Sequence, residues 1–200
     1  MKSMKLVIVD GLDGVGKDTH AQLIKKRYEA QGLSVVIRSH PSFDHFFGRL
    51  SKQALLGRGT MKKIKASLFY ALDVLHSVRY FYQKGDSDVL IMVRYLIGTA
   101  YLPRPIVKLG YTFFECFVPT SEYMFFLDAD PEVLYERVQK RQKQEMFETL
   151  ASLKRVHEKA MPLLKGWYIV DTSGSIQQTF SQIQEVLNLL DKREGELASR

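Results

Sequence analysis

The feature that most constrains the fold is a glycine-rich turn that joins an apolar run to a helical pattern near the N-terminus. The apolar run, Lys5–Val9, has the length of a buried strand. After the turn, Lys17–Gln31 repeats apolar residues at helical spacing until Gly32. Glycines let the backbone turn tightly and approach an anion, and the N–H groups that begin a helix carry partial positive charge. The arrangement predicts a phosphate-binding loop, in which Lys17 reaches the terminal phosphates of a nucleoside triphosphate, taken as ATP.

One position of this loop departs from the usual pattern, Gly-x-x-x-x-Gly-Lys-[Ser/Thr]. Gly11, Gly16 and Lys17 satisfy the pattern, but Asp18 stands where a hydroxyl residue is expected. A carboxylate beside a polyphosphate needs a cation to offset the repulsion between the two. We expect the loop to contact ATP through Gly11, Leu12, Asp13, Gly14, Val15, Gly16, Lys17, Asp18 and Thr19.

Apolar runs and helical patterns alternate along the rest of the chain. Four further strands are predicted at Ser34–Arg38, Val89–Val93, Tyr123–Asp128 and Trp167–Val170. Helical patterns cover Phe46–Leu56, Lys63–Gln83, Pro105–Phe117, Pro131–Gln142, Thr149–Leu164 and Ile176–Asp191, and residues 192–200 are expected to form a frayed polar tail. The alternation is typical of an α/β fold with a five-stranded parallel sheet flanked by helices, and we expect one domain over residues 1–200. Ligands of such sheets bind at the carboxyl ends of the strands, which singles out residues 10–19, 39–43, 94–95 and 128–130.

The composition narrows the class of protein and its partners. Hydrophobic residues make up 46% and charged residues 26% of the chain, as in soluble globular proteins. No apolar run reaches the ~18 residues of a membrane span, and we expect no membrane partner. The net charge is +7, but the basic runs at 62–65 and 137–143 lack interleaved aromatic residues and read as solvated helix faces, so no nucleic-acid partner is expected. The single cysteine, Cys116, favours a reducing compartment and a cytoplasmic protein.

Several segments, taken in order along nearly the whole chain, resemble thymidylate kinases. They are IVDGLDGVGKDTHA at the loop, SLFYA at 67–71, VRY at 93–95 with GTAY at 98–101, FFLDADPEVLYERVQKR at 125–141, FE at 147–148 and VDTSGSIQQ at 170–178. The resemblance implies a three-layer P-loop kinase fold with a short lid at about residues 142–148. It also implies transfer of the ATP γ-phosphoryl group to a nucleoside monophosphate, dTMP, usually by a homodimer with Mg²⁺.

The resemblance assigns roles to single residues. Lys17, Arg94 and Arg141 take the catalytic role, with Arg94 clamping the acceptor phosphate and bridging to the donor. Arg137 joins the ATP-binding set, because its helix leads to the lid. The acceptor-binding set is Asp13, Phe43, Phe69, Asp73, Arg94, Tyr95 and Tyr101, with Asp13 at the sugar and Phe69 on the base.

Five positions depart from the family pattern: Asp18, Phe43, Asp73, Val93 and Met146. Asp73 replaces an arginine that hydrogen-bonds thymine, and a carboxylate, which only accepts hydrogen bonds, suits an exocyclic amine better. The alternative is that Asp73 pairs with a neighbouring Lys or Arg, or that a shifted helix register takes it away from the base. Phe43 and Met146 replace arginines of the acceptor site and the lid. Three hypotheses stay open: a thymidylate kinase, a kinase of the same fold with a different acceptor, and a nucleotide-binding protein with little catalysis.

Asp18 and Val93 suggest a relocated metal ligand. In phosphate-loop enzymes a hydroxyl after the lysine and a carboxylate at the end of a neighbouring strand support Mg²⁺. Val93 replaces that strand-end carboxylate, and Asp18 places one in the loop instead. The hypothesis is that Asp18 holds Mg²⁺, directly or through water. The alternative is that Asp18 merely caps the helix and that the protein binds nucleotide poorly.

Overall fold

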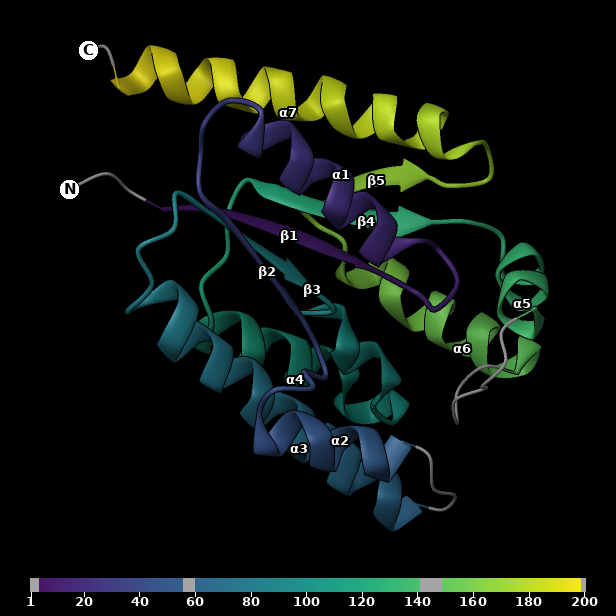
Figure 1. The fold of residues 1–200 in the computed structure, drawn as a ribbon. Coiled ribbons are helices and arrows are strands. Elements are labelled where there is room, and N and C mark those ends of the chain that lie inside the picture. Colours follow the sequence, from purple (N-terminus) through teal and green to yellow (C-terminus); the bar gives the residue numbers. More distant parts are fainter. Residues whose placement is uncertain (1–3, 56–59, 141–148, 199–200) are drawn as a thin grey trace.

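The structure is a computed structural model that describes residues 4–55, 60–140 and 149–198. Five strands form one parallel sheet in the order β2-β3-β1-β4-β5, which confirms the predicted sheet (Figure 1). The strands are β1 (Lys5–Gly11), β2 (Val35–Ser39), β3 (Val89–Val93), β4 (Tyr123–Asp128) and β5 (Tyr168–Asp171). Every residue of β3 is buried, as expected for a parallel strand covered on both faces.

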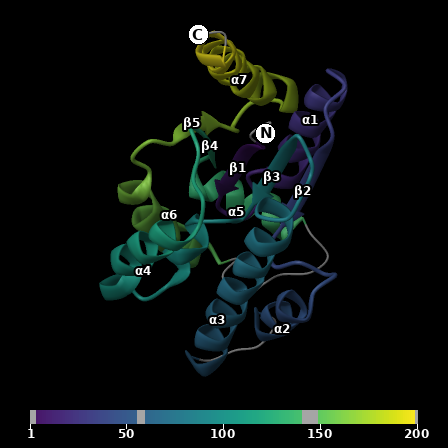
Figure 2. The same cartoon turned by 90° about the vertical axis from the view of Figure 1, so that its left-hand side faces the viewer.

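Helices cover both faces of the sheet. Figure 1 shows α1 (Lys17–Glu29) and α7 (Ile176–Ala198) on one face, and α3 (Thr60–Ser77), α4 (Arg104–Phe117) and α6 (Leu150–Ala160) on the other. Helix α2 (Phe46–Leu55) packs beside α3 (Figure 2), and α5 (Pro131–Gln139) packs beside α6 (Figure 1). Short helical turns of other types span Val78–Tyr82, Ile97–Tyr101 and Met161–Leu163. None of the described helices is long and apolar enough to cross a membrane.

The C-terminal helix corrects one expectation. The sequence predicted an end near Asp191 and a frayed tail, whereas α7 continues to Ala198. Contacts across the fold hold this end of the helix. Lys5 pairs with Asp191 and lies 2.8 Å from Glu194, and the Tyr123 hydroxyl donates to Glu194 at 3.0 Å. Residues at the amino ends of β1 and β4 therefore hold the C-terminal part of α7 in place. Its polar sequence did not predict these contacts.

The central strand β1 sets the geometry at the carboxyl edge of the sheet. In the parallel register Val9 lies beside Val93, and Gly11 lies beside Leu127. The buried Asp10 side chain then crosses to the segment after β3, where its Oδ2 accepts the backbone N–H groups of residues 95, 96 and 97 at 3.0, 2.8 and 3.1 Å. The glycine-rich loop and the residues after β3 are thereby held side by side.

Two glycines with positive φ, one in the phosphate loop and one after α1, differ in how closely other atoms approach them. Gly11 has φ +145°, and a Cβ there would lie 2.3 Å from the Leu127 carbonyl oxygen. Gly32 has φ +78°, and nothing lies within 4 Å of its Cβ position. Substitution at Gly11 therefore adds a backbone clash to the conformational strain, whereas substitution at Gly32 adds strain alone.

We predict that Gly11→Ala lowers the free energy of unfolding by about 3 kcal/mol or more, since strain and overpacking each cost roughly 1–3 kcal/mol. Gly32→Ala should lower it by only about 1 kcal/mol. Urea unfolding followed by circular dichroism measures both. Equal losses in the two variants would contradict the close approach of β1 to β4 at the loop.

Candidate active site

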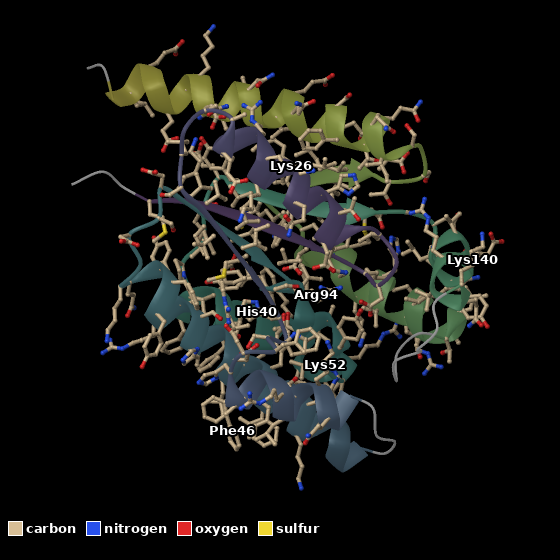
Figure 3. The ribbon with its side chains drawn as sticks, in the orientation of Figure 1. Lys26, His40, Phe46, Lys52, Arg94 and Lys140 are labelled. Carbon is tan, nitrogen blue, oxygen red and sulfur yellow. The ribbon has the colours of Figure 1, made fainter. Side chains whose placement is uncertain are left out.

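A cavity of about 690 Å³ opens at the carboxyl ends of β1, β2 and β3, within the size range of small-ligand sites. Its polar wall carries Asp13, Lys17, Asp18, Ser39 and Arg94. Apolar side chains from α3 and α4 face that wall, among them Leu75, Phe113, Phe114 and Phe117. In Figure 3, Arg94 and His40 lie between the sheet and helices α2 and α3, and Lys52 lies on α2 near them. The cavity therefore offers charged groups at one end and an apolar surface at the other.

Lys17 lies buried beneath the loop, as the motif predicted. Its Nζ donates to the carbonyl oxygens of Gly11 at 2.8 Å and Leu12 at 2.5 Å, and lies 3.8 Å from Oδ1 of Asp13. Burial, followed by repulsion from the Arg94 guanidinium, lowers the pKa of Lys17 to about 8. The ammonium is thus held in the loop by neutral carbonyl groups. Phosphate oxygens can displace these carbonyls because they add a negative charge on the acceptor side of the hydrogen bond.

Arg94 follows β3 in an unusual backbone conformation. Its φ is 54°, in the left-handed region, which costs a non-glycine residue about 1–2 kcal/mol. Two hydrogen bonds hold this backbone: the Arg94 N–H donates to the Val9 carbonyl at 3.3 Å, and the Tyr70 hydroxyl donates to the Arg94 carbonyl. A strained residue held in this way at the mouth of a cavity is typical of a functional position.

Asp18 and Arg94 form an ion pair across the cavity mouth. The guanidinium Nη1 lies 3.2 Å from Oδ1 of Asp18, and Nη2 lies 3.1 Å from Oδ2. Ser39 Oγ donates to the same Oδ1 at 3.0 Å. Partial burial opposes ionisation, but Arg94 and Ser39 together hold the pKa of Asp18 below its ordinary value. The cap of α1 is Gly16, without a side-chain hydrogen bond, so these contacts favour a charge partner over a capping role for Asp18.

Asp13 and Tyr101 meet on the same side of the cavity. The Tyr101 hydroxyl donates to Oδ2 of Asp13 at 2.9 Å, and both side chains line the cavity. The resemblance had placed both of them in the acceptor site. The structure brings them together and fixes the orientation of the Asp13 carboxylate.

The aromatic residues of the predicted acceptor site divide into two groups. Phe43 lines the cavity, is 71% exposed, and has Lys52 Nζ 3.3 Å from its ring centre. Tyr95 is fully buried in the core, where its hydroxyl donates to the Pro119 carbonyl at 3.1 Å. Phe69 does not line the cavity, whereas Tyr70, one position further along α3, does. The helix therefore turns Tyr70 toward the site in place of the residue that the resemblance singled out.

Asp73 is fully buried and paired within the protein. Its two carboxylate oxygens accept the Ser42 N–H at 2.7 Å and the Ser42 hydroxyl at 2.6 Å. The side chain does not line the cavity. Asp73 is therefore paired within the protein, as the alternative held, although its partner is Ser42 and not a Lys or Arg. This geometry gives no support to a direct contact with the acceptor base.

The remaining predicted residues lie as follows. Arg137 donates to the Thr172 carbonyl at 2.7 Å and to its hydroxyl at 3.3 Å, which joins α5 to the segment after β5, outside the cavity. Thr19 is exposed on α1. Arg141 and the predicted lid at 142–148 lie outside the described residues. The cavity lining includes Gly11, Asp13, Lys17, Asp18, Phe43, Arg94 and Tyr101, but not Leu12, Gly14, Val15, Gly16, Thr19, Phe69, Asp73, Tyr95 or Arg137.

Three residues of the site were not assigned a role from the sequence. Ser39 donates to Asp18 and accepts from Arg94 Nη1 at 3.0 Å. Tyr70 supports the Arg94 backbone, and Lys52 adds a cation to the cavity wall. Ser39 directly follows the predicted second strand, so its place at the strand end was a usable signal. Lys52 and Tyr70 lie on helices, where the sequence did not fix which face meets the cavity.

Three comparisons with known proteins agree. The sequence model of the family described as Thymidylate kinase matches residues 9–183. A probable thymidylate kinase 1 of Saccharolobus solfataricus is 27% identical over 92% of this chain and 96% of its own length. A probable thymidylate kinase of Methanococcus maripaludis is 28% identical over 94% of this chain and 96% of its own length.

The solved structure of the thymidylate kinase from Candida albicans superposes with a TM-score of 0.73, covering 94% of this chain and 93% of that one. Its sequence identity is 18%, so this likeness supports the fold alone. The family match covers most of the chain, and the cavity lies where the matched loop and the segment after β3 meet. This chain belongs to the thymidylate kinase family.

Proposed function

We propose that this protein transfers the γ-phosphoryl group of ATP to thymidine monophosphate. The observation that carries the proposal is that Lys17, in the phosphate loop, and Arg94, after β3, line one cavity. Phosphoryl transfer depends on positioning the two substrates and on stabilising charge on the transferred group. Two cations from adjacent strand ends supply that stabilisation at one place.

Each residue of the polar wall has a role in this transfer. The N–H groups of the loop and Lys17 would bind the donor phosphates, with Lys17 exchanging its carbonyl partners for phosphate oxygens. Arg94 would bind the acceptor phosphate through the paired N–H groups of its guanidinium. The attacking atom is an oxygen of that acceptor phosphate, which is anionic at neutral pH. The chain therefore needs no general base to activate it, and binding both phosphates in line is the main catalytic task.

The opposite end of the cavity suits the nucleoside. Asp13, oriented by Tyr101, presents carboxylate oxygens that accept hydrogen bonds from a sugar hydroxyl. Phe43 and the apolar side chains of α3 and α4 provide flat surface for a base. Because the Asp73 carboxylate is engaged by Ser42, it offers no contact that selects an amino-substituted base over thymine. The named relatives likewise favour thymidylate over the alternative acceptor and over a role without catalysis.

The donor phosphates would carry Mg²⁺, and the residues fit that ion in a limited way. Among the described residues no group of three acidic, histidine or cysteine side chains could hold a metal. Mg²⁺ needs less than such a cage, since it is commonly bound by one carboxylate together with phosphates and waters. Asp18 fits this requirement, because its carboxylate is 62% exposed at the cavity mouth. The ion would neutralise charge on the phosphates, and Asp18 would hold it directly or through water.

Three further properties remain part of the proposal. A lid at about 142–148 would close over ATP and exclude water, and Arg141, just before it, would move toward the donor phosphates. If hydrogen exchange in this segment does not slow when both nucleotides bind, the lid has no support.

The reaction would take place in the cytoplasm, as the lone Cys116 and the substrates suggest. Cell fractionation that finds the protein in another compartment would contradict this.

A homodimer is also proposed. Helix α3 and the turn after it present Leu68 and Tyr80, outside the cavity, with exposures of 57% and 53%, which is apolar surface that a second copy could cover. Sedimentation at micromolar concentration should show a dimer, and a monomer at that concentration would contradict the proposal.

We predict that thymidine monophosphate is the preferred acceptor in a screen of nucleoside monophosphates with Mg·ATP. The reason is that Ser42 engages the Asp73 carboxylate, the group that the sequence suggested would favour an exocyclic amine. Nucleoside diphosphate formation, measured by chromatography, gives the ranking. A strong preference for cytidine or adenosine monophosphates would contradict the assignment, and ATP binding without any transfer would support the non-catalytic alternative.

We predict that Lys17→Met folds at least as stably as the parent at pH 7, yet loses about 100-fold or more in turnover. The pKa of Lys17 falls from 10.5 in the unfolded chain to about 8 in the fold, so holding the ammonium charged at pH 7 costs stability. The unfolded chain binds more protons between pH 8 and pH 10.5. The parent should therefore gain stability relative to Lys17→Met as the pH rises through this window.

Thermal melting and steady-state kinetics measure the two effects. Lys26→Met, at an exposed position of the same helix, is the control and should change neither quantity. Parental turnover in a folded Lys17→Met variant would remove Lys17 from the chemistry.

A further inference from the structure

The ion pair between Asp18 and Arg94 occupies the group that the acceptor phosphate needs. Both terminal nitrogens of the guanidinium face the carboxylate, at 3.2 Å and 3.1 Å. The same pair of N–H groups is the one that binds a phosphate in bidentate fashion. Nη1 also donates to Ser39, which itself donates to Asp18, so Nη1 has two acceptors while Nη2 lies against Asp18 alone.

A phosphate at Arg94 is incompatible with Asp18 in this position. A carboxylate oxygen within about 3 Å of the guanidinium would lie in direct like-charge contact with a phosphate bound there. Asp18 must therefore move away when the acceptor binds. Little holds it back, because its side chain is 62% exposed and its described hydrogen bonds are with Arg94 and Ser39 only.

The displaced carboxylate has one attractive destination. Asp18 directly follows Lys17 in the first turn of α1, and both line the cavity, so its carboxylate lies close to the donor phosphates that Lys17 would bind. Without a cation the carboxylate would repel the phosphates. With Mg²⁺ on the phosphates, the carboxylate could become a ligand of the ion. A single rotation of the Asp18 side chain would then both free Arg94 and bring the carboxylate to the metal.

We propose that Asp18 is an exchangeable counter-ion: it neutralises Arg94 in the nucleotide-free site, and the acceptor phosphate displaces it toward the Mg²⁺ carried by ATP. This inference rests on the proposed function and adds a coupling between the two substrates. Because coupling free energies are reciprocal, Mg·ATP should raise the affinity for the acceptor, and the acceptor should raise the affinity for Mg·ATP. Asp18 acts here through Arg94 and the metal, as a positioning residue.

The test measures binding of thymidine monophosphate by isothermal titration calorimetry under two conditions. The first contains EDTA and no other nucleotide, and the second contains Mg²⁺ with a non-hydrolysable ATP analogue. For the parent we expect affinity to rise about tenfold in the second condition, within the usual range of such couplings. For Asp18→Asn we expect about tenfold tighter binding than the parent in EDTA, because no carboxylate has to be displaced, and no further rise with the Mg²⁺ complex.

Asp44→Asn is a matched control. Asp44 also pairs with both terminal nitrogens of an arginine, Arg38, at 2.6 and 3.0 Å, and its side chain is likewise 62% exposed. It does not line the cavity. This variant removes the same charge from a similar pair and should retain both parental affinities. Melting curves for the two variants check that each is folded.

The outcomes separate the inference from the function it rests on. Unchanged affinity of Asp18→Asn in EDTA overturns the counter-ion role. Tighter binding in EDTA with the coupling retained overturns the exchange, since Asp18 would then be only a repulsive neighbour. A parent that binds no thymidine monophosphate in either condition overturns the proposed function, and the exchange with it.

Discussion

The geometry of the site depends on one buried carboxylate, Asp10, at the end of the central strand. Burying an ion costs several kcal/mol unless hydrogen bonds compensate for the lost water. Burial raises the pKa of Asp10, while three backbone N–H groups from residues 95–97 and the nearby Lys17 charge oppose that rise. These donors come from the segment directly after Arg94. One side chain therefore ties the phosphate loop to the strand end that carries the second cation.

The charged groups of the site are held by short polar contacts within the protein. Lys17 rests on loop carbonyls, Arg94 on Asp18, and Asp13 on the Tyr101 hydroxyl. Each contact keeps a group near its proposed place of action. Lys17 and Arg94 would exchange their partners for phosphate oxygens, whereas Tyr101 would continue to orient Asp13. Substrate binding is then an exchange of partners on a prepared scaffold, which keeps the ordering cost low. It also explains how a loop built for phosphate tolerates a carboxylate: Asp18 has a cation partner within reach.

Patterns with local causes were readable from the sequence. Apolar runs located all five strands, and the largely buried strands Val89–Val93 and Tyr123–Asp128 were predicted to the residue. The phosphate loop was readable because glycine spacing directly reflects backbone geometry. The start of α5 also has a local cause, because Asp130 precedes Pro131 and its side chain accepts from the Glu132 N–H.

Features that depend on distant residues were not readable. The extent of α7 depends on Lys5 and Tyr123, which lie far from it in sequence. The choice of Tyr70 over Phe69 depends on the rotation of α3 against the sheet, and one residue on a helix changes the direction of a side chain by about 100°. The sequence suggested that Asp73 selects the acceptor base, but Ser42, on a different segment, donates to both of its carboxylate oxygens. The sequence contained both partners of the Asp18–Arg94 pair but gave no distance between them.

The most direct test of the account is a crystal structure with a bisubstrate analogue in which adenosine and thymidine are joined through a chain of phosphates. The account predicts phosphates lying between Lys17 and Arg94, the thymine against Phe43, and the Asp18 carboxylate turned away from Arg94. Phosphates bound elsewhere, or an Arg94 guanidinium still paired with Asp18 in the complex, would contradict it.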